Sequence, residues 1–115
     1  PLTMGSGEFL PFEFPLAYWM EQQGYDVTYC ANADLLTPDR ALKCKSFLSV
    51  GHDEYWSTPM RDNLEAWIAK GGNVAFFSGN TCCWQVRSEA EGRAFTCFKQ
   101  NYHLDPVFQT RDFKT

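Results

Sequence analysis

The sequence lacks any apolar run long enough to cross a membrane. Its longest uninterrupted apolar stretch is about five residues, whereas a spanning helix needs roughly 20. No signal peptide is visible at the N-terminus, which starts at Pro1 and not at a methionine. We therefore expect no membrane-spanning segment, and whether a targeting segment was removed stays open.

Excess positive charge is also missing. The chain has 10 Lys and Arg residues against 14 Asp and Glu residues, a formal net charge of −4, and its basic residues are scattered singly. Nucleic acids and anionic membrane surfaces are bound by clustered Lys and Arg. The sequence therefore argues against both as partners.

The cysteines form no paired motif. There are five, an odd number with no Cys-x-x-Cys spacing: Cys30, Cys44, Cys82, Cys83 and Cys97. This pattern fits neither a disulfide framework nor a structural zinc site. We expect reduced and mostly buried thiols, and hence a cytoplasmic location.

What the chain does contain is enough apolar material for a core. Apolar residues make up 44% and aromatic residues 17% of its 115 positions, so disorder is not expected. This length allows one domain, residues 1–115, but is small for a complete doubly wound α/β enzyme. We predict a fragment of a larger α/β domain.

Periodicity and breakers predict the elements. Helices are expected at 15–23, where Pro15 suits the first turn and Gly24 the end, at 38–42, and from Thr58 to the glycines at 71–72. Thr58 is the expected N-cap of this last helix, and Trp19 and Trp67 are assigned to the core. Strands are expected at 25–29, 46–50, 73–77 and 94–99, while residues 1–13, 32–34 and 88–93 are assigned to loops and the tail beyond 105 to irregular structure.

The strand, helix and strand across residues 46–77 form a βαβ unit, which implies a parallel sheet. Both strands are continuous apolar runs, as in strands buried on both faces. Their two polar ends, at 52–55 and 78–80, should lie at the same edge of the sheet, where open α/β sheets bind ligands. This places His52, Asp53, Glu54 and Tyr55 near Ser78, Asn80 and Trp84.

Three functional interpretations of this cluster stay open. Tyr55 as phenolate, with a carboxylate, would suit ferric iron or a similar hard ion. Asp53 or Glu54 could act as general acid or base with His52, or the cluster could only orient a substrate. Alternatively, the two carboxylates merely favour the N-terminus of the following helix. Consecutive side chains point in different directions, so the four can face one ion only if the turn is irregular.

Two further candidate sites contain cysteine or histidine. A nucleophilic Cys82 or Cys83 near a helix N-terminus would need His52 or His103 beside it. His103 with Asp105 is more typical of a surface pair.

A set of motifs in order along the chain resembles the N,N-dimethylformamidase large-subunit-like family. They are GYDVTY at 24–29, SVGHDEYWS at 49–57, FFSGN at 76–80, Trp84 and Arg87, CFK at 97–99 and DP at 105–106. The resemblance implies a flavodoxin-like fold, similar to class I glutamine amidotransferases, in which Gly79 and Asn80 replace the amidotransferase cysteine.

For the founding enzyme the resemblance also implies hydrolysis of a small amide at a mononuclear iron held by two tyrosines and a glutamate. Tyr55 matches one tyrosine by motif; Tyr18 and Tyr25 lie in the general region of the second, and the glutamate is not placed. We therefore predict Tyr55 as metal ligand, iron as cofactor, a small amide as substrate, and His52, Asp53, Glu54 and Asn80 as catalytic residues. The alternative is a non-catalytic binding or structural module that packs on neighbouring domains or on a second copy.

Overall fold

The structure is a computed structural model that describes residues 8–110. Its elements are short helices and strands in mixed order, so the predicted α/β content is confirmed. The N-terminal half contains η1 (Phe9–Glu13), α1 (Phe14–Gln22), η2 (Asn32–Leu36), α2 (Pro38–Ala41), β1 (Ser46–His52), β2 (Tyr55–Trp56) and α3 (Thr58–Ala69). The C-terminal half contains β3 (Asn73–Gly79), β4 (Trp84–Gln85), β5 (Arg87–Glu89), η3 (Ala90–Gly92), β6 (Ala94–Thr96), η4 (Tyr102–Leu104) and α4 (Pro106–Thr110).

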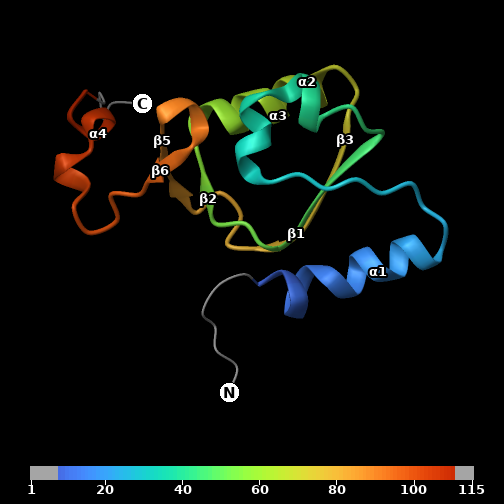
Figure 1. Ribbon diagram of the computed structural model, residues 1–115. Helices are drawn as coiled ribbons and strands as arrows, with labels where there is room; N and C mark the ends of the chain where they lie inside the picture. The colour runs from blue at the N-terminus through green and yellow to red at the C-terminus, as the bar shows by residue number, and fades with distance from the viewer. Residues whose placement is uncertain (1–7, 111–115) are drawn as a thin grey trace.

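The centre of the fold is the predicted βαβ unit. Strands β1 and β3 pair in parallel from Ser46 opposite Asn73 to His52 opposite Gly79, and α3 connects them. Helices α2 and α3 lie on one side of this pair and α1 on the other (Figure 1). Two further pairs, the parallel β2–β4 and the antiparallel β5–β6, extend the molecule towards the C-terminus.

The core forms where α3 and η2 meet β1. It consists of Leu35, Leu42, Phe47, Trp56, Met60 and Leu64. The predicted apolar face of α3 supplies Met60 and Leu64, which are 1% and 3% exposed. Helix η2 is attached to α3 because the Asn63 Nδ2 donates to the Leu35 carbonyl oxygen at 2.8 Å. This contact holds η2 near the end of β1.

Helix α3 begins at Thr58, as predicted, but its N-cap is the residue before. Ser57, not Thr58, is its N-cap, since the Ser57 Oγ accepts from the Met60 N–H at 3.4 Å. The Thr58 hydroxyl instead accepts from the Gln85 Nε2 and joins α3 to β4. The predicted helix at 15–23 is confirmed as α1, and Gly24 beyond its end has the expected left-handed φ of +79°.

The strand prediction for 25–29 is wrong, because the structure assigns no element there. No strand pairs with this segment among the described residues, and its Tyr25 and Tyr29 side chains are 60% and 58% exposed. The expectation that β3 is buried on both faces is also wrong: Phe76 and Phe77 are 47% and 62% exposed. Adjacent residues of a strand point to opposite faces of the sheet, so β3 is open to solvent on both faces here.

Other corrections concern loops, aromatics and thiols. The part of 1–13 that the structure describes contains helix η1, and the segment at 32–34 begins η2. The end of β5 and η3 lie in the predicted loop at 88–93, and α4 lies in the tail that was assigned to irregular structure. Of the two tryptophans that were assigned to the core, Trp19 is 50% exposed and Trp67 packs against the core. The thiols are not buried, since Cys30 and Cys83 are exposed and the other three are partly exposed.

Candidate functional site

The predicted meeting of the two polar strand ends is confirmed. His52 pairs with Gly79 at the end of the parallel ladder, and the Asp53 N–H donates to the Gly79 carbonyl oxygen at 3.2 Å. The chain then leaves this ladder, because the Trp84 N–H donates to the Glu54 carbonyl oxygen at 2.9 Å and starts the β2–β4 pair. The turn is therefore irregular, and consecutive side chains diverge within it.

The Asp53 carboxylate is occupied by hydrogen bonds. Its Oδ1 accepts from the Asn32 Nδ2 and from the Trp56 Nε1, both at 2.7 Å, and its Oδ2 accepts from the Ser49 Oγ at 2.5 Å. The Ser49 Oγ also lies 2.8 Å from the Ser78 Oγ. Asp53 thus connects η2, β1, β2 and the end of β3. This arrangement favours a positioning role over proton transfer for Asp53.

His52 and Glu54 are the two titratable residues of the turn whose side chains face each other. The His52 Nε2 lies 3.5 Å from the Glu54 Oε2, and its Nδ1 lies 3.4 Å from the Glu8 Oε2. The Glu54 side chain is only 15% exposed, against 37% for His52. A partly exposed imidazole between two carboxylates can exchange protons with both.

A third carboxylate stands close by. Burial raises the pKa of Glu13, and the charges of Asp53 and Glu8 raise it further. Helix η1 approaches the strand end here because position 51 is a glycine: a Cβ on Gly51 would lie 3.1 Å from the Glu13 Cγ. The turn is therefore acidic on the side that faces η1.

A cavity of about 320 Å³ lies beside the turn after β1. Its wall consists of Asn32, His52, Asp53, Glu54, Tyr55, Met60, Val86 and Phe95. Polar groups come from η2 and from the turn after β1, and apolar ones from α3, the β4–β5 connection and β6. The volume suits a small organic molecule.

Tyr55 lies in the cavity wall, but its hydroxyl accepts a hydrogen bond from the Lys99 Nζ. The same ammonium lies 4.7 Å from the centre of the Tyr55 ring and 5.5 Å from that of Trp84. The hydrogen bond to Tyr55 raises the pKa of Lys99. A cation at the phenol oxygen competes with a metal ion for the same atom.

The iron site implied by the resemblance is therefore not complete in the described residues. Within 8–110, no group of three or more His, Cys, Asp or Glu side chains converges in a way that could hold a metal ion. Glu54 and His52 face each other, which makes two donors, and Tyr55 is engaged by Lys99. Tyr18 and Tyr25 do not line the cavity and are 51% and 60% exposed.

Asn80 stands apart from the other predicted catalytic residues. It occupies a left-handed position with φ of +51° in the turn after β3, where its carbonyl oxygen accepts from the Cys83 N–H at 3.0 Å. Its side chain is exposed and does not line the cavity. The neighbouring Cys82 has a raised thiol pKa, first because of burial and then because of the Asp53 charge. These surroundings disfavour a thiolate nucleophile.

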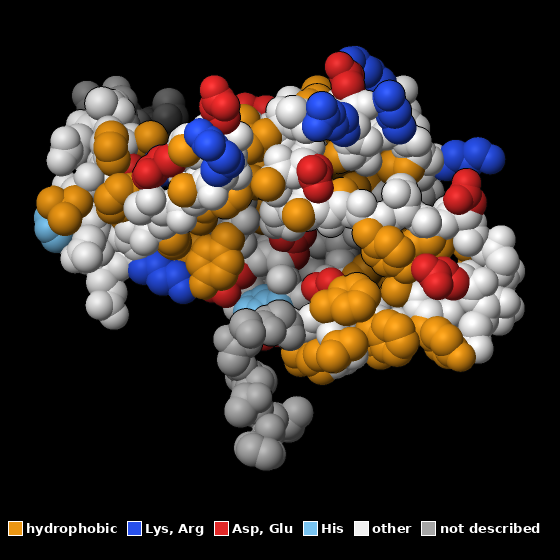
Figure 2. Space-filling view, in the orientation of Figure 1, with side chains coloured by type: hydrophobic (Ala, Val, Ile, Leu, Met, Phe, Trp, Pro, Cys, Tyr) orange, Lys and Arg blue, Asp and Glu red, His pale blue; other side chains and the backbone are white. Residues whose placement is uncertain are grey.

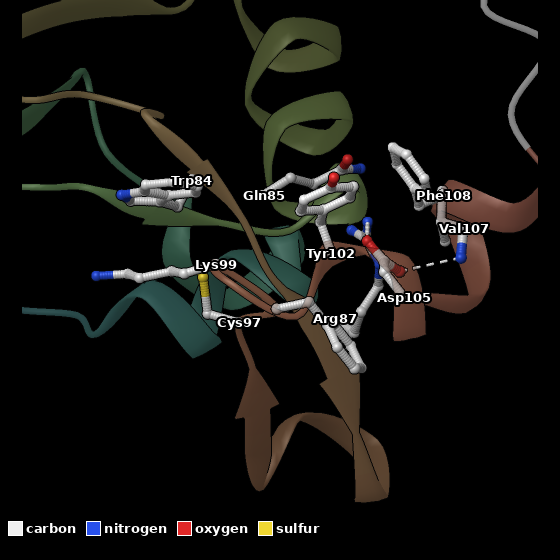
Figure 3. A pocket seen from close by; sticks show the side chains of 10 residues that line it. Trp84, Gln85, Arg87, Cys97, Lys99, Tyr102, Asp105, Val107 and Phe108 are labelled. Carbon is white, nitrogen blue, oxygen red and sulfur yellow. Dashed lines mark hydrogen bonds and ion pairs between the residues drawn. The ribbon is translucent and has the colours of Figure 1, made fainter.

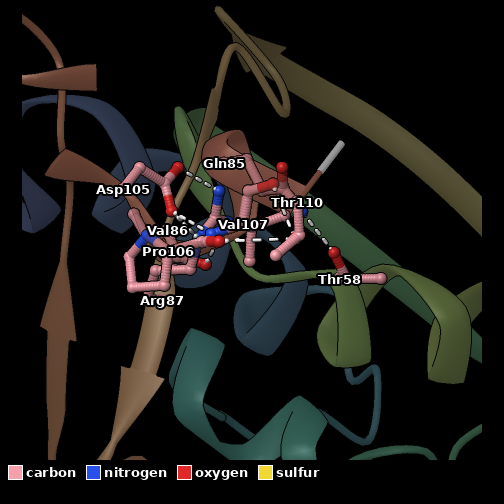
Figure 4. A network of polar contacts seen from close by, with 8 residues as sticks. All are labelled: Thr58, Gln85, Val86, Arg87, Asp105, Pro106, Val107 and Thr110. Carbon is pink, nitrogen blue, oxygen red and sulfur yellow. Dashed lines mark hydrogen bonds and ion pairs between the residues drawn. The ribbon is translucent and has the colours of Figure 1, made fainter. Parts of the chain in front are cut away.

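The predicted surface pair of His103 with Asp105 is wrong. Asp105 is 8% exposed and accepts from the guanidinium of Arg87, with the Arg87 Nε at 2.8 Å from its Oδ1 (Figure 4). Its Oδ1 also accepts from the Val107 N–H at 3.0 Å. The hydrogen bonds from Arg87 hold the pKa of Asp105 below its usual value. This network joins β5 to the start of α4.

A second, smaller cavity of about 150 Å³ lies beside this network (Figure 3). Trp84 and Lys99 lie side by side at one end of it and Phe108 at the other. Its arginine is already paired with Asp105, and the Lys99 ammonium is bound to Tyr55. Both of its cationic groups are thus paired within the protein.

Sequence reasoning missed Asn32, Phe95 and Lys99 at the site. The Asn-Ala-Asp string at 32–34 was a usable signal, because Asp34 accepts from the Ala31 N–H at 2.8 Å and starts a local helical turn. Nothing local in the sequence connects Lys99 with Tyr55, 44 positions away.

The comparison with protein families gave a match over the whole chain. A family model described as N,N-dimethylformamidase beta subunit-like, C-terminal, matches residues 1–115. No curated protein and no solved structure matched the sequence.

Proposed function

The chain belongs to the N,N-dimethylformamidase beta subunit-like, C-terminal family, and from that premise we propose that it carries the site of a hydrolase acting on the C–N bond of a small amide. The observation that supports this most is the His52–Glu54 pair, 3.5 Å apart in the wall of a 320 Å³ cavity. Both groups exchange protons readily, as amide hydrolysis requires.

In the proposed reaction, Glu54 accepts a proton from a water molecule while the water oxygen attacks the amide carbonyl carbon. His52, next to Glu54, passes a proton to the amide nitrogen as the C–N bond breaks. The products are the carboxylic acid and the free amine. Transfer of the proton from Glu54 to the neighbouring His52 then returns Glu54 to the carboxylate and His52 to the imidazolium with which the cycle began. Asp53 takes no proton in this scheme, since three donors already occupy its carboxylate.

Iron as cofactor stays a prediction, with Tyr55 as its ligand. Binding at Tyr55 would require the phenol oxygen to exchange Lys99 for the metal, and further donors from outside the described residues. Metal analysis of the full-length protein, with a visible phenolate-to-iron absorption band that disappears in Tyr55→Phe, would support the prediction. A metal-free, colourless and active protein would contradict it.

The finer fold assignment is likewise our proposal. The parallel β1–β3 pair with its α3 crossover agrees with the centre of a flavodoxin-like, amidotransferase-like sheet, of which residues 1–115 form one partial domain. Within the described range no helix has the length and apolar character of a membrane crossing. We also propose a cytoplasmic location, on the basis of five unpaired thiols.

The test of the activity is a screen of small amides with the full-length protein, measuring release of the amine. Glu54→Gln should lower kcat at least about 100-fold, the usual contribution of a general acid or base. Glu89→Gln is the matched control, because Glu89 is exposed on β5 away from the cavity, and its rate should equal that of the wild type. A Glu54→Gln variant with more than a tenth of wild-type activity contradicts the proposed role.

One observation favours the alternative, a non-catalytic module. Large apolar side chains gather exposed over η1 and α1 (Figure 2), with exposed fractions from 42% to 71%: Phe9, Leu10, Phe12, Phe14, Tyr18 and Trp19. An apolar surface of this extent is typical of a face that packs on another domain. A wild-type protein that binds amides without releasing amine would support the module and reject the hydrolase.

A further inference from the structure

A chain of three hydroxyl groups joins the turn after β3 to the carboxylate of Asp53. The Ser49 Oγ donates to the Asp53 Oδ2 at 2.5 Å and lies 2.8 Å from the Ser78 Oγ. The Ser78 Oγ in turn lies 2.8 Å from the Thr81 Oγ1. Ser49 is only 4% exposed, and Ser78 and Thr81 are half-buried. The hydrogen bonds at Ser49 are therefore shielded from competing water.

The direction of these hydrogen bonds follows from the number of protons. Each hydroxyl group has one proton to donate, and a carboxylate has none. Since the Ser49 proton is used on Asp53, the Ser49 oxygen accepts from Ser78. The Ser78 proton is then used on Ser49, so the Ser78 oxygen accepts from Thr81. Hydrogen bonds that are aligned in this way polarise and strengthen one another, and the three hydroxyl groups act together on one carboxylate.

The backbone joins the same two turns. The Asp53 N–H donates to the Gly79 carbonyl oxygen at 3.2 Å, and the Cys82 N–H donates to the Asp53 carbonyl oxygen at 3.0 Å. Asp53 is thus held by its side chain and by both of its backbone groups. Because Asp53 stands between His52 and Glu54 in the sequence, its position decides where their side chains start.

We propose that Ser78 and Thr81 are positioning residues, which hold the His52–Glu54 pair in place through Asp53. Neither of them lines the cavity, so neither contacts a substrate there. Without their hydroxyl groups the turn after β1 is held less firmly against the turn after β3, and a small misplacement of catalytic groups slows the chemical step. The effect on the rate rests on the proposed function, whereas the coupling of the two turns does not.

Removal of single hydroxyl groups tests the inference in the full-length protein. Ser78→Ala and Thr81→Val each remove one hydroxyl group, and Thr81→Val keeps the shape of the side chain. We expect each variant to lower kcat for amine release about twofold to tenfold, the worth of one net hydrogen bond. KM should change by less than about twofold, because the lost group contacts no substrate. Thr81→Ser keeps the hydroxyl group and should have the wild-type rate.

A double variant separates an action through Ser49 from a general loss of packing. Once Ser49→Ala has broken the chain next to Asp53, the addition of Ser78→Ala should lower kcat no further, since the effects of residues in one hydrogen-bond network do not add. Thr110→Val is the matched control. The Thr110 hydroxyl donates within α4, and this variant should have the wild-type rate.

Amide hydrogen exchange measures the coupling of the two turns without turnover. The reporters are the N–H groups of Asp53 and Cys82, whose hydrogen bonds bridge the turns. In Ser78→Ala and Thr81→Val these two groups should exchange about twofold to tenfold faster than in the wild type. The amides in the middle of the β1–β3 ladder should keep their wild-type rates.

Wild-type kcat in Ser78→Ala and Thr81→Val, additive losses in the double variant, or unchanged exchange at the two reporters overturns the inference. Faster exchange in a protein whose wild type releases no amine supports the inference and rejects the proposed hydrolase. If Ser78→Ala does not fold, as judged by circular dichroism, the comparison of Thr81→Val with Thr81→Ser carries the test. The two proposals can therefore fail separately.

Discussion

Removing the Asp53 carboxylate should destabilise the fold by an amount that depends mainly on one of its three donors. In Asp53→Ala the Trp56 indole N–H loses its acceptor while the side chain stays 3% exposed. An unsatisfied buried donor costs about 1–3 kcal/mol. The Ser49 hydroxyl can turn towards Ser78, 2.8 Å away, and the exposed Asn32 amide can bind water, so both add little. We expect a loss of about 1–3 kcal/mol in the free energy of unfolding.

Asp53→Asn should cost less, about 0.5–1 kcal/mol. The new amide oxygen still accepts from Trp56, and the new amide nitrogen can donate to the Ser49 Oγ if that hydroxyl turns to donate to Ser78. The assay is urea unfolding of the full-length protein followed by circular dichroism, with the Trp56 indole N–H resonance as a local probe. Asp26→Ala, at an exposed position, is the control and should stay within about 0.5 kcal/mol of the wild type. The reasoning is refuted if Asp53→Ala stays within that range too, or if both Asp53 variants lose the same stability.

Three further predictions concern other parts of the fold. Ser57→Ala removes the N-cap of α3 and should lower the free energy of unfolding by about 1 kcal/mol in the same urea assay; an unchanged midpoint would show that the cap contributes nothing. Arg87→Met should cost about 1.5–3 kcal/mol at pH 7, because Asp105 then loses its charged hydrogen-bond donor. Since Arg87 lowers the pKa of Asp105, the stability that the pair contributes is present above pH about 4 and is lost as the pH falls through the lowered pKa. If Arg87→Met and the wild type still differ in their free energy of unfolding at pH 2, this explanation is contradicted. Alkylation of the exposed Cys83 should leave the proposed amide hydrolysis unchanged, whereas loss of activity both on alkylation and in Cys83→Ser would favour a cysteine mechanism.

The sequence predicted the parts of the fold that depend on local patterns. Helix α3 and the strands on either side were predicted because periodicity, capping residues and terminal glycines agree there. The strand predicted at 25–29 failed because β propensity has no effect on a segment that pairs with no other strand. Of the hairpin β5–β6, strand β6 lies within the strand predicted at 94–99, whereas β5 was missed because Arg87–Glu89 is polar and its pairing with Ala94–Thr96 is set by contacts and not by an apolar pattern.

As with the fold, only the part of the site that follows from local patterns could be predicted from the sequence. The meeting of His52 with the end of β3 follows from the rule that the ends of neighbouring parallel strands share an edge. The different roles of Asp53 and Glu54 in the turn do not follow from the sequence, because they depend on where each side chain points once the backbone leaves the β1–β3 ladder. Asp53 turns towards buried donors and Glu54 towards His52. Asn32 and Lys99 reach the site through long-range contacts that no local motif records.

The attachment of η2 has a consequence for the order in which the molecule loses activity and structure. Helix η2 is held by Leu35 in the core and by the hydrogen bond from Asn63, while the backbone ladder between β1 and β3 includes no residue of η2. Short peripheral helices open by local fluctuations at lower free energy than the central unit. Because η2 carries Asn32, such an opening removes one wall of the cavity and releases Asp53 while the βαβ unit stays folded. Rising urea should therefore abolish the proposed amide hydrolysis before it unfolds the protein, and the backbone amides of η2 should exchange with solvent earlier than those of β1.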